Sequence, residues 1–449
     1  MVHVVVREYD YLVCSSDEVP NLERGKRKAF EIPDKDFSYL ERLMSGEESK
    51  EQSDDLSFFL KRTSWGRAKA FQIQSFVGVL QTPDGTQLEI LPKHVDGKVS
   101  EEKGRAMLFT MLRYLRDASF NLGGDAHLKH APMHLLDLFV AYFLQEINLL
   151  VKKGIRSDYV AREENQTFLK GKLLVNQHIR MNSIQQQRFY VSYDEYLPDR
   201  AENRLIHAAL VKIIRLDVSA SNQRLCRELM FVFDGIPISS DVRKDFSLCK
   251  FNRAMVHYRH ALEWCRLILN DESAVPSAGS TQAISILFPM EKIFEDYVAA
   301  MLRRHLPPEY QVYTQASGKY LCEKPKKFRL RPDILIRKND SKECFIADTK
   351  WKVIDANEIN KGISQSDMYQ LYAYGKKYQN EKDTCCGLFL IYPQSPKFIK
   401  EIENEFAFDF EEGLRLHCLS FDCDIGSHKS AKGAAKDFSD RLSCHFFSE

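Results

Sequence analysis

The stretch from Arg331 to Lys352 constrains the fold more than any other part of this chain. It reads RPDILIRKNDSKECFIADTKWK, in which two short apolar runs, 333–336 and 344–348, flank the polar residues 339–342. Asparagine, aspartate and serine favour turns, and two apolar runs joined by such residues are typical of a β-hairpin. The sequence therefore predicts a hairpin in this stretch.

The hairpin would bring three charged side chains together. If its turn is centred between Asp340 and Ser341, Asp333 faces Asp348 on the opposite strand. Side chains alternate along a strand, so Lys350 shares the face of Asp348. Two carboxylates directly opposite one another repel and destabilise a sheet unless positive charge lies between them.

A divalent cation with a lysine beside it would relieve that repulsion. Ligand sets made of oxygen atoms suit Mg²⁺, or Mn²⁺ in its place, rather than zinc. The alternative is an edge hairpin whose charged side chains are simply solvated. The flanking segments bear on this choice.

Upstream, residues 289–306 have the apolar spacing of a helix. Its apolar stripe consists of Ile293, Phe294, Tyr297, Val298, Met301 and Leu302. Glu295 lies at the margin of this stripe, where it is either a further metal ligand or an ordinary solvated glutamate.

Downstream, residues 367–379 predict a second helix, with Ser366 as its N-cap. Gln370 and Tyr374 lie four residues apart and therefore share one helix face. The alternative role for the tyrosine is a place in a buried aromatic stripe. Two strand-like runs follow, 385–392 and 414–421, and this order of elements indicates an α/β module with a mixed sheet.

Taken together, these residues resemble the PD-(D/E)xK nuclease superfamily in its RecB-like branch. The wording is closer still to the McrC family, the nuclease subunit of modification-dependent McrBC restriction systems. The positions that carry the resemblance are Glu295, Asp333, Asp348, Lys350, Gln370 and Tyr374, and Trp351 and Lys352 also match the family wording.

The resemblance extends well beyond the hairpin. Three stretches resemble the amino-terminal signature of the McrC family: FVGVL at 76–80, PDG at 83–85 and LEILPK at 88–93. Three further stretches resemble the central signature of that family: DYVAREEN at 158–165, LKGK at 169–172 and DRAEN at 199–203.

The resemblance implies a metal-dependent DNA endonuclease subunit. Asp333 and Asp348 would hold Mg²⁺, with the Thr349 carbonyl and Glu295 as further oxygen ligands. Lys350 would orient or deprotonate the attacking water. Gln370 and Tyr374 would position the DNA backbone, as in RecB-like nucleases.

The resemblance also implies partners: double-stranded, modified DNA and an McrB-like AAA+ GTPase hexamer. McrC-type subunits insert their amino-terminal region into that ring and stimulate its GTP hydrolysis. No P-loop sequence occurs in this chain, which agrees with a GTPase on another chain.

A length of 449 residues predicts a multidomain protein of mixed α/β and α+β class. We expect a β-rich, partner-binding region at 1–100, a mainly helical region at 101–275 and a PD-(D/E)xK nuclease module at 283–449, in which helices flank a mixed sheet. The boundary is the Ser-, Ala- and Gly-rich segment 271–282. The chain has no membrane-spanning run or signal peptide and its 11 cysteines have no zinc-type spacing, so we expect a cytoplasmic protein.

Charge is local rather than global. The net charge is only +1, yet residues 323–352 hold ten Lys or Arg against five acids. A basic cluster beside the acid pair suits a polyanionic backbone, although lysines also keep edge hairpins soluble.

Two other functions remain open. The chain could be a regulatory or assembly subunit of an AAA+ motor whose nuclease is inactive, or a stand-alone RecB-like repair nuclease. The intact acid pair and lysine oppose the first, and a neighbouring GTPase gene would oppose the second.

Overall fold

The computed structural model describes residues 2–17, 21–24, 27–45, 59–93, 100–115, 134–185, 187–249, 253–269, 284–355, 357–379, 383–410, 414–423 and 436–444. The chain forms two compact units. One unit combines Met1–Pro132 with Leu287–Glu449, and the other is Met133–Ile286. The expected boundary at 271–282 lies outside the described residues.

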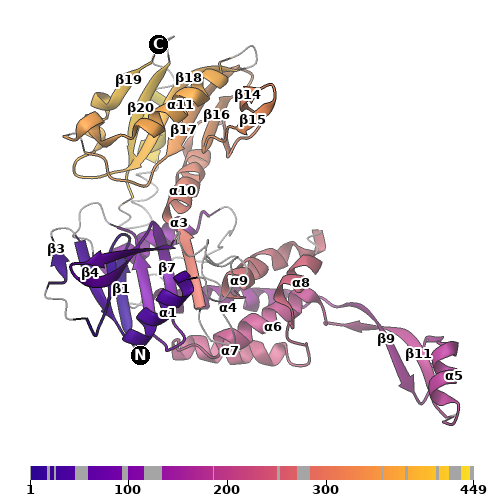
Figure 1. The fold of residues 1–449 in the computed structure, drawn as a ribbon. Coiled ribbons are helices and arrows are strands. Elements are labelled where there is room, and N and C mark those ends of the chain that lie inside the picture. Colours follow the sequence, from indigo (N-terminus) through magenta and orange to yellow (C-terminus); the bar gives the residue numbers. More distant parts are fainter. Residues whose placement is uncertain are drawn as a thin grey trace. The chain divides into compact units, whose positions relative to one another are not determined.

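The amino-terminal part of the first unit is rich in strands, as predicted (Figure 1). One sheet has the order β3-β4-β2-β6-β5 and the other has the order β1-β8-β7-β12. The strands are β1 (His3–Arg7), β2 (Tyr11–Cys14), β3 (Glu23–Arg24), β4 (Arg27–Ile32), β5 (Leu60–Trp65), β6 (Ala68–Ile73), β7 (Phe76–Gln81), β8 (Gln87–Leu91) and β12 (Ile284–Pro289).

Among the described residues of this part, the helices α1 (Asp34–Ser45) and α3 (Glu101–Leu112) accompany the sheets. The sequence division assigns α3 to the middle region, whereas α3 packs against β8 and α10 (Met290–His305) and belongs to the first unit. A buried ion pair joins Arg105 of α3 to Glu89 of β8. Such a pair holds the helix in register on the sheet, because either charge left alone in the interior is costly.

The carboxyl-terminal part of the first unit contains the predicted mixed sheet. Its order is β13-β16-β17-β18-β20-β19. The pair β17·β18 and the pair β18·β20 are parallel, and the others are antiparallel. The strands are β13 (Tyr310–Thr314), β16 (Ile334–Lys338), β17 (Glu343–Thr349), β18 (Thr384–Pro393), β19 (Ala407–Asp409) and β20 (Arg415–Phe421), and a separate hairpin pairs β14 (Tyr320–Glu323) with β15 (Lys326–Arg329).

The predicted hairpin register is confirmed. Ile334 pairs with Ala347 and Ile336 with Phe345, which is the pairing that a turn centred between Asp340 and Ser341 requires. Buried Ile and Phe side chains on these strands fix the register, since a slip by one residue would turn each of them to the opposite face of the sheet.

Helices α10 and α11 (Gln365–Lys377) lie beside this sheet, and short 3-10 turns run over Ile359–Gly362 and Lys400–Phe406. All six predicted stripe residues of α10 are buried. The predicted N-cap of α11 is wrong: the helix begins at Gln365, and the N-cap position is Ser364. The hydroxyls of Ser364 and Ser366 lie 2.6 Å apart and bond to one another instead of capping a backbone N–H group.

The second unit is mainly helical, as expected. Its helices are α4 (Leu135–Lys153), α5 (Val175–Asn182), α6 (Ala201–Ile213), α7 (Ala220–Val232), α8 (Val242–Leu248) and α9 (Arg259–Leu269), with a 3-10 turn at Arg253–Tyr258. No helix among the described residues combines the length and apolar character that a membrane crossing needs.

The sequence does not predict the long hairpin that extends from these helices (Figure 1). We call this hairpin the arm. It pairs β9 (Asp158–Gln166) with β11 (Phe189–Leu197), β10 (Lys172–Leu173) adds to β11, and α5 packs on β11. Most β9 side chains are exposed, so the strand lacks the alternation of apolar and polar residues that reveals a half-buried strand.

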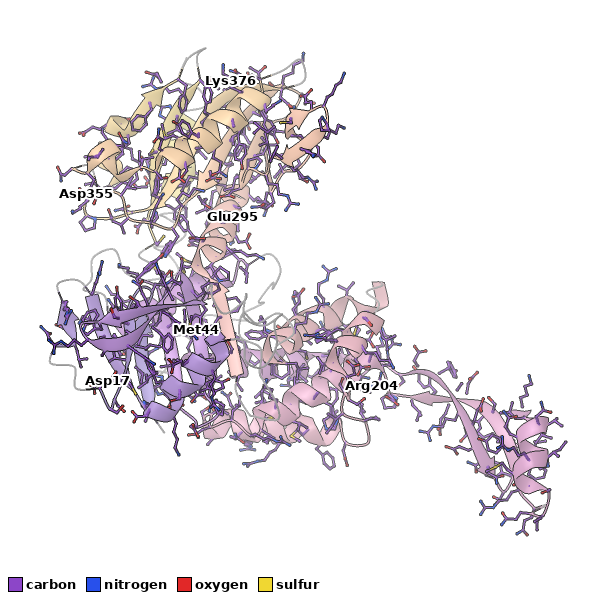
Figure 2. The ribbon with its side chains drawn as sticks, viewed as in Figure 1. Asp17, Met44, Arg204, Glu295, Asp355 and Lys376 are labelled. Atoms are coloured by element: carbon purple, nitrogen blue, oxygen red, sulfur yellow. The ribbon has the colours of Figure 1, made fainter. Side chains whose placement is uncertain are left out.

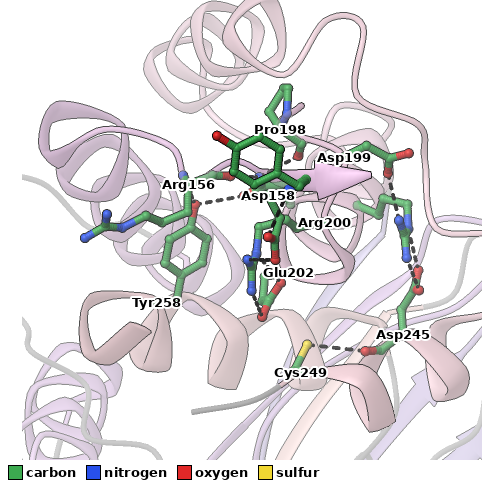
Figure 3. A network of polar contacts seen from close by, with 12 residues as sticks. Arg156, Asp158, Pro198, Asp199, Arg200, Glu202, Asp245, Cys249 and Tyr258 are labelled. Atoms are coloured by element: carbon green, nitrogen blue, oxygen red, sulfur yellow. Dashed lines mark hydrogen bonds and ion pairs between the residues drawn. The ribbon is translucent and has the colours of Figure 1, made fainter. Parts of the chain in front are cut away.

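A polar network fixes the root of the arm (Figure 3). Asn203 is buried and donates to the carbonyls of Arg156 and Pro198, which flank the two arm strands, at 2.9 and 2.7 Å. Arg200 pairs with Asp158 at 2.6 Å. Because these contacts join both strands to α6, the signature residues Arg200 and Asn203 hold the base of the arm in place.

The glycine of the LKGK stretch, Gly171, is required by the close packing of the arm. Gly171 has a φ of +71°, and a Cβ atom there would lie 2.4 Å from the Ser192 carbonyl oxygen. Any residue with a Cβ would therefore be strained both by its backbone and by its neighbour.

Candidate active site

The site forms where β17 and its neighbours end. Asp333 immediately precedes β16, while Asp348 and Thr349 are the last residues of β17. Lys350 follows directly, and its backbone N–H donates to the Ile391 carbonyl of β18 at 2.9 Å. The parallel β17·β18 pair thus fixes the backbone that carries the acid and the lysine.

Asp333, Thr349 and Lys350 line one cleft of about 860 Å³ within the first unit, and the buried Asp348 pairs with Lys350 at its wall. Its walls are lined by Tyr9, Pro289, Glu291, Lys292, Glu295, Gln315, Asp333, Thr349, Lys350, Trp351, Lys352 and Asp367. Glu295 reaches it from α10, the helix on which Figure 2 labels this side chain.

Glu295 and Asp333 share one donor. The side-chain amide of Gln315 donates to Glu295 Oε1 at 2.9 Å and to Asp333 Oδ1 at 3.3 Å. The other Asp333 oxygen accepts from the Thr349 backbone N–H at 3.0 Å and from its hydroxyl at 3.2 Å. Glu295 therefore belongs to the same cluster as Asp333, and the Gln315 amide group that donates to both acids lies between them.

Asp348 is the most deeply buried acid of the cluster. It is 1 % exposed, and no described residue donates a hydrogen bond to its Oδ1 atom. The pKa of Asp348 is raised to about 7, because burial and then the nearby Asp333 charge favour the protonated form more than the ion pair with Lys350 opposes it. A buried carboxylate oxygen without a donor fits a position where a cation binds.

Lys350 keeps its charge in this setting. Burial alone lowers the pKa of Lys350, but the charge and hydrogen bonding of Asp348 outweigh burial and the net pKa is raised. The ammonium group is therefore an ion at neutral pH and lies beside the acid pair.

Gln370 and Tyr374 stand behind Lys350. The Gln370 amide donates to the Tyr374 hydroxyl at 2.9 Å, and its carbonyl oxygen lies 3.5 Å from Lys350 Nζ. The Tyr374 side chain is buried, and its hydroxyl donates to the Arg331 carbonyl at 3.2 Å. This geometry suits residues that hold the lysine and the Asp333 segment in place.

Sequence reasoning did not identify Gln315, Asp367 or Tyr9 as site residues. Asp367 is buried and forms an ion pair with Lys352 at 2.5 Å. Lys352 is the second of the two residues after Lys350 that match the family wording, so this pair gives it a partner. Tyr9 comes from a segment far from the hairpin in the sequence, Gln315 comes from the loop after β13, and neither stands in a recognisable spacing. Nothing in the sequence alone marks them.

The fold and the site together define a multidomain α/β protein with an acidic, lysine-bearing cleft at the end of a mixed sheet. Residues 71–393 match the family model described as McrBC 5-methylcytosine restriction system component. The chain belongs to this family. No curated protein matches the chain.

One solved structure agrees with this chain at the level of fold. A chain of a half-complex of Thermococcus gammatolerans McrB AAA+ hexamers with bound McrC is 20 % identical, with a TM-score of 0.65, and the match covers 98 % of this chain and 100 % of that one. A chain of the Thermococcus gammatolerans McrBC complex is 22 % identical with a TM-score of 0.44, and the match covers 68 % and 88 %.

The raised pKa of Asp348 yields a prediction about stability. A carboxyl group that ionises near pH 4 when unfolded but near pH 7 when folded makes the native state bind more protons, so the group increasingly destabilises the protein as pH rises from about 4 to about 7. Asp348→Asn should therefore raise the melting temperature in chelator-treated protein, by about 1–2 °C per kcal/mol gained in a chain of this length.

Thermal melts between pH 4 and pH 8 measure this effect. The gain from Asp348→Asn should grow with pH and level off above about 7. Asp340→Asn in the exposed turn is the matched control and should change little. A gain that does not vary with pH would contradict the assignment.

Proposed function

We propose that this chain is the Mg²⁺-dependent DNA endonuclease subunit of an McrBC-like restriction and defence system. The observation that carries the proposal is the cluster of Asp333, Asp348 and Lys350 at the ends of adjacent strands, where Asp333 and Lys350 line the cleft and the buried Asp348 pairs with Lys350. Glu295 on α10 completes an all-oxygen donor set. Family membership supports the restriction system, and the site supports the nuclease.

In this proposal Asp333 and Asp348 hold the ion, with the Thr349 carbonyl and Glu295 as further ligands. Mg²⁺, when bound, polarises the scissile phosphate and lowers the pKa of the attacking water, and Mn²⁺ suits the same ligands. Lys350 orients that water and stabilises the charge that develops on the phosphate. Gln370 and Tyr374 hold Lys350 and the Asp333 segment in position.

The hairpin β14–β15 supports DNA as the substrate. It lies directly before Asp333 in the chain, and residues 321–329 are all exposed. Lys324, Lys326 and Lys327 therefore present their charges to solvent close in sequence to the acid pair. Contacts of this kind bind the phosphate backbone without reading the sequence.

Both the family and the surface support a protein partner, which we propose to be an McrB-like AAA+ GTPase hexamer that the chain stimulates. The related Thermococcus chain is described as bound to McrB AAA+ hexamers. Apolar side chains on the arm are exposed, as at protein interaction sites. They include Phe168, Leu169, Ile179, Met181 and Ile184.

Removing Asp348 tests the catalytic assignment. Asp348→Ala should reduce Mg²⁺-dependent cleavage of modified duplex DNA by at least about 100-fold, because the metal loses a ligand and Lys350 loses its partner. Stimulation of the partner GTPase should stay intact. Asp340→Asn is the control and should cleave normally, because asparagine tolerates the positive φ of this exposed turn position.

The outcomes separate the three functions. Undiminished cutting by Asp348→Ala would refute the site. A wild-type chain that stimulates the GTPase but cuts no DNA would indicate a regulatory subunit. Efficient cutting of unmodified duplex by the isolated chain would indicate a stand-alone repair nuclease.

The DNA surface has its own test. Replacing Lys324, Lys326 and Lys327 by alanine should weaken DNA binding and lower the slope of log affinity against log salt by about 2–3, since each phosphate contact releases about one counterion. Fluorescence anisotropy at several salt concentrations measures this slope. Alanine at Arg243 and Lys244, exposed on α8, is the control, and an unchanged slope for the β14–β15 variant would place the DNA elsewhere.

A further inference from the structure

Trp351 has no part in the proposed chemistry, yet it directly follows Lys350. Its side chain is 9 % exposed, and its ring packs against that of Phe294 on α10 at 5.3 Å between centroids. The indole N–H donates to Glu8 Oε2 at 3.0 Å. This bond links the lysine segment to a residue more than 300 positions earlier in the chain.

Glu8 is firmly held at the amino-terminal sheet. It follows β1 directly and is 1 % exposed. Besides the indole, its carboxylate accepts from the Lys93 backbone N–H at 2.9 Å and from the Ser75 hydroxyl at 3.2 Å. Burial raises the pKa of Glu8 to about 7 although these hydrogen bonds oppose the shift, so the group is desolvated as well as fully engaged.

The same corner of the sheet also supports α10. The Ser75 carbonyl accepts from the backbone N–H of Met290, the first residue of α10, at 3.0 Å. The residue after Glu8, Tyr9, has a φ of +66° and lines the cleft. The amino-terminal sheet thus touches the lysine segment, the helix of Glu295 and the cleft wall within a few residues.

We propose that Glu8 is a positioning residue for the nuclease site, which fixes the Lys350 segment through the Trp351 indole and thereby makes the amino-terminal sheet part of the site's support. The inference rests on the proposed nuclease function. It gives the family-matching Trp351 a physical role.

The test compares Trp351→Phe, Glu8→Ala and Glu8→Gln in the full chain with its GTPase partner, Mg²⁺ and modified duplex DNA. Trp351→Phe keeps an aromatic ring but removes the indole N–H donor and part of the ring volume. We expect kcat to fall about 10- to 100-fold in Trp351→Phe and Glu8→Ala, since small displacements of a catalytic group are costly, while KM changes little. Glu8→Gln keeps an acceptor for the indole and should recover most of the rate.

Trp65→Phe is the matched control. Trp65 is also buried, and its indole donates to the Asn21 carbonyl at 2.8 Å, far in sequence from the nuclease module. This variant loses one equivalent hydrogen bond and should cleave like the wild type. Thermal melts of both tryptophan variants separate lost stability from lost positioning.

Each outcome bears on one claim. Normal kcat in Trp351→Phe and Glu8→Ala, with a wild type that cleaves, would overturn the positioning role and leave the nuclease intact. Equal loss in Trp65→Phe, or no recovery in Glu8→Gln, would also overturn it. A wild type that does not cleave would overturn the proposed function and the inference together.

Discussion

Confining two carboxylates at the ends of adjacent strands is the constraint on which the site depends. Asp348 is buried close to Asp333, and the cost of this arrangement appears as a pKa near 7. Nearby groups reduce that cost from several sides: Lys350 pairs with Asp348, and Thr349 and Gln315 donate to Asp333. Thr349 and Lys350 lie at the end of β17, and Gln315 directly follows β13. The two strands that flank β16 in the sheet therefore supply the groups that keep the acids together.

The register of the hairpin could be predicted because local chemistry determines it. Turn residues at 339–342 and buried apolar residues on both strands leave one favourable pairing, and the observed Ile334–Ala347 pair follows from it. The apolar stripe of α10 and the two later strands could also be predicted from the spacing of their apolar residues. The position of Glu295 was left open, since a residue at the margin of a stripe can point either way.

Other features depend on contacts that local spacing does not encode. Gln315 joins two acids from a loop, and Glu8 meets Trp351 across most of the chain length. The arm was not predicted because most side chains of β9 are exposed and because its root is held by Asn203 and Arg200, which are distant from β9 in the sequence. The start of α11 was misplaced by two residues because two serines compete for the N-cap position.

A crystal of the chain grown with Mn²⁺ would test the central claim most directly, because the ion is visible by anomalous scattering. We expect one strong peak in the cleft, bound by carboxylate oxygens of Asp333 and Asp348 at about 2.0–2.3 Å, within reach of Lys350. An empty cleft at saturating Mn²⁺, with the two acids still engaged only by Thr349, Gln315 and Lys350, would contradict a metal-dependent site.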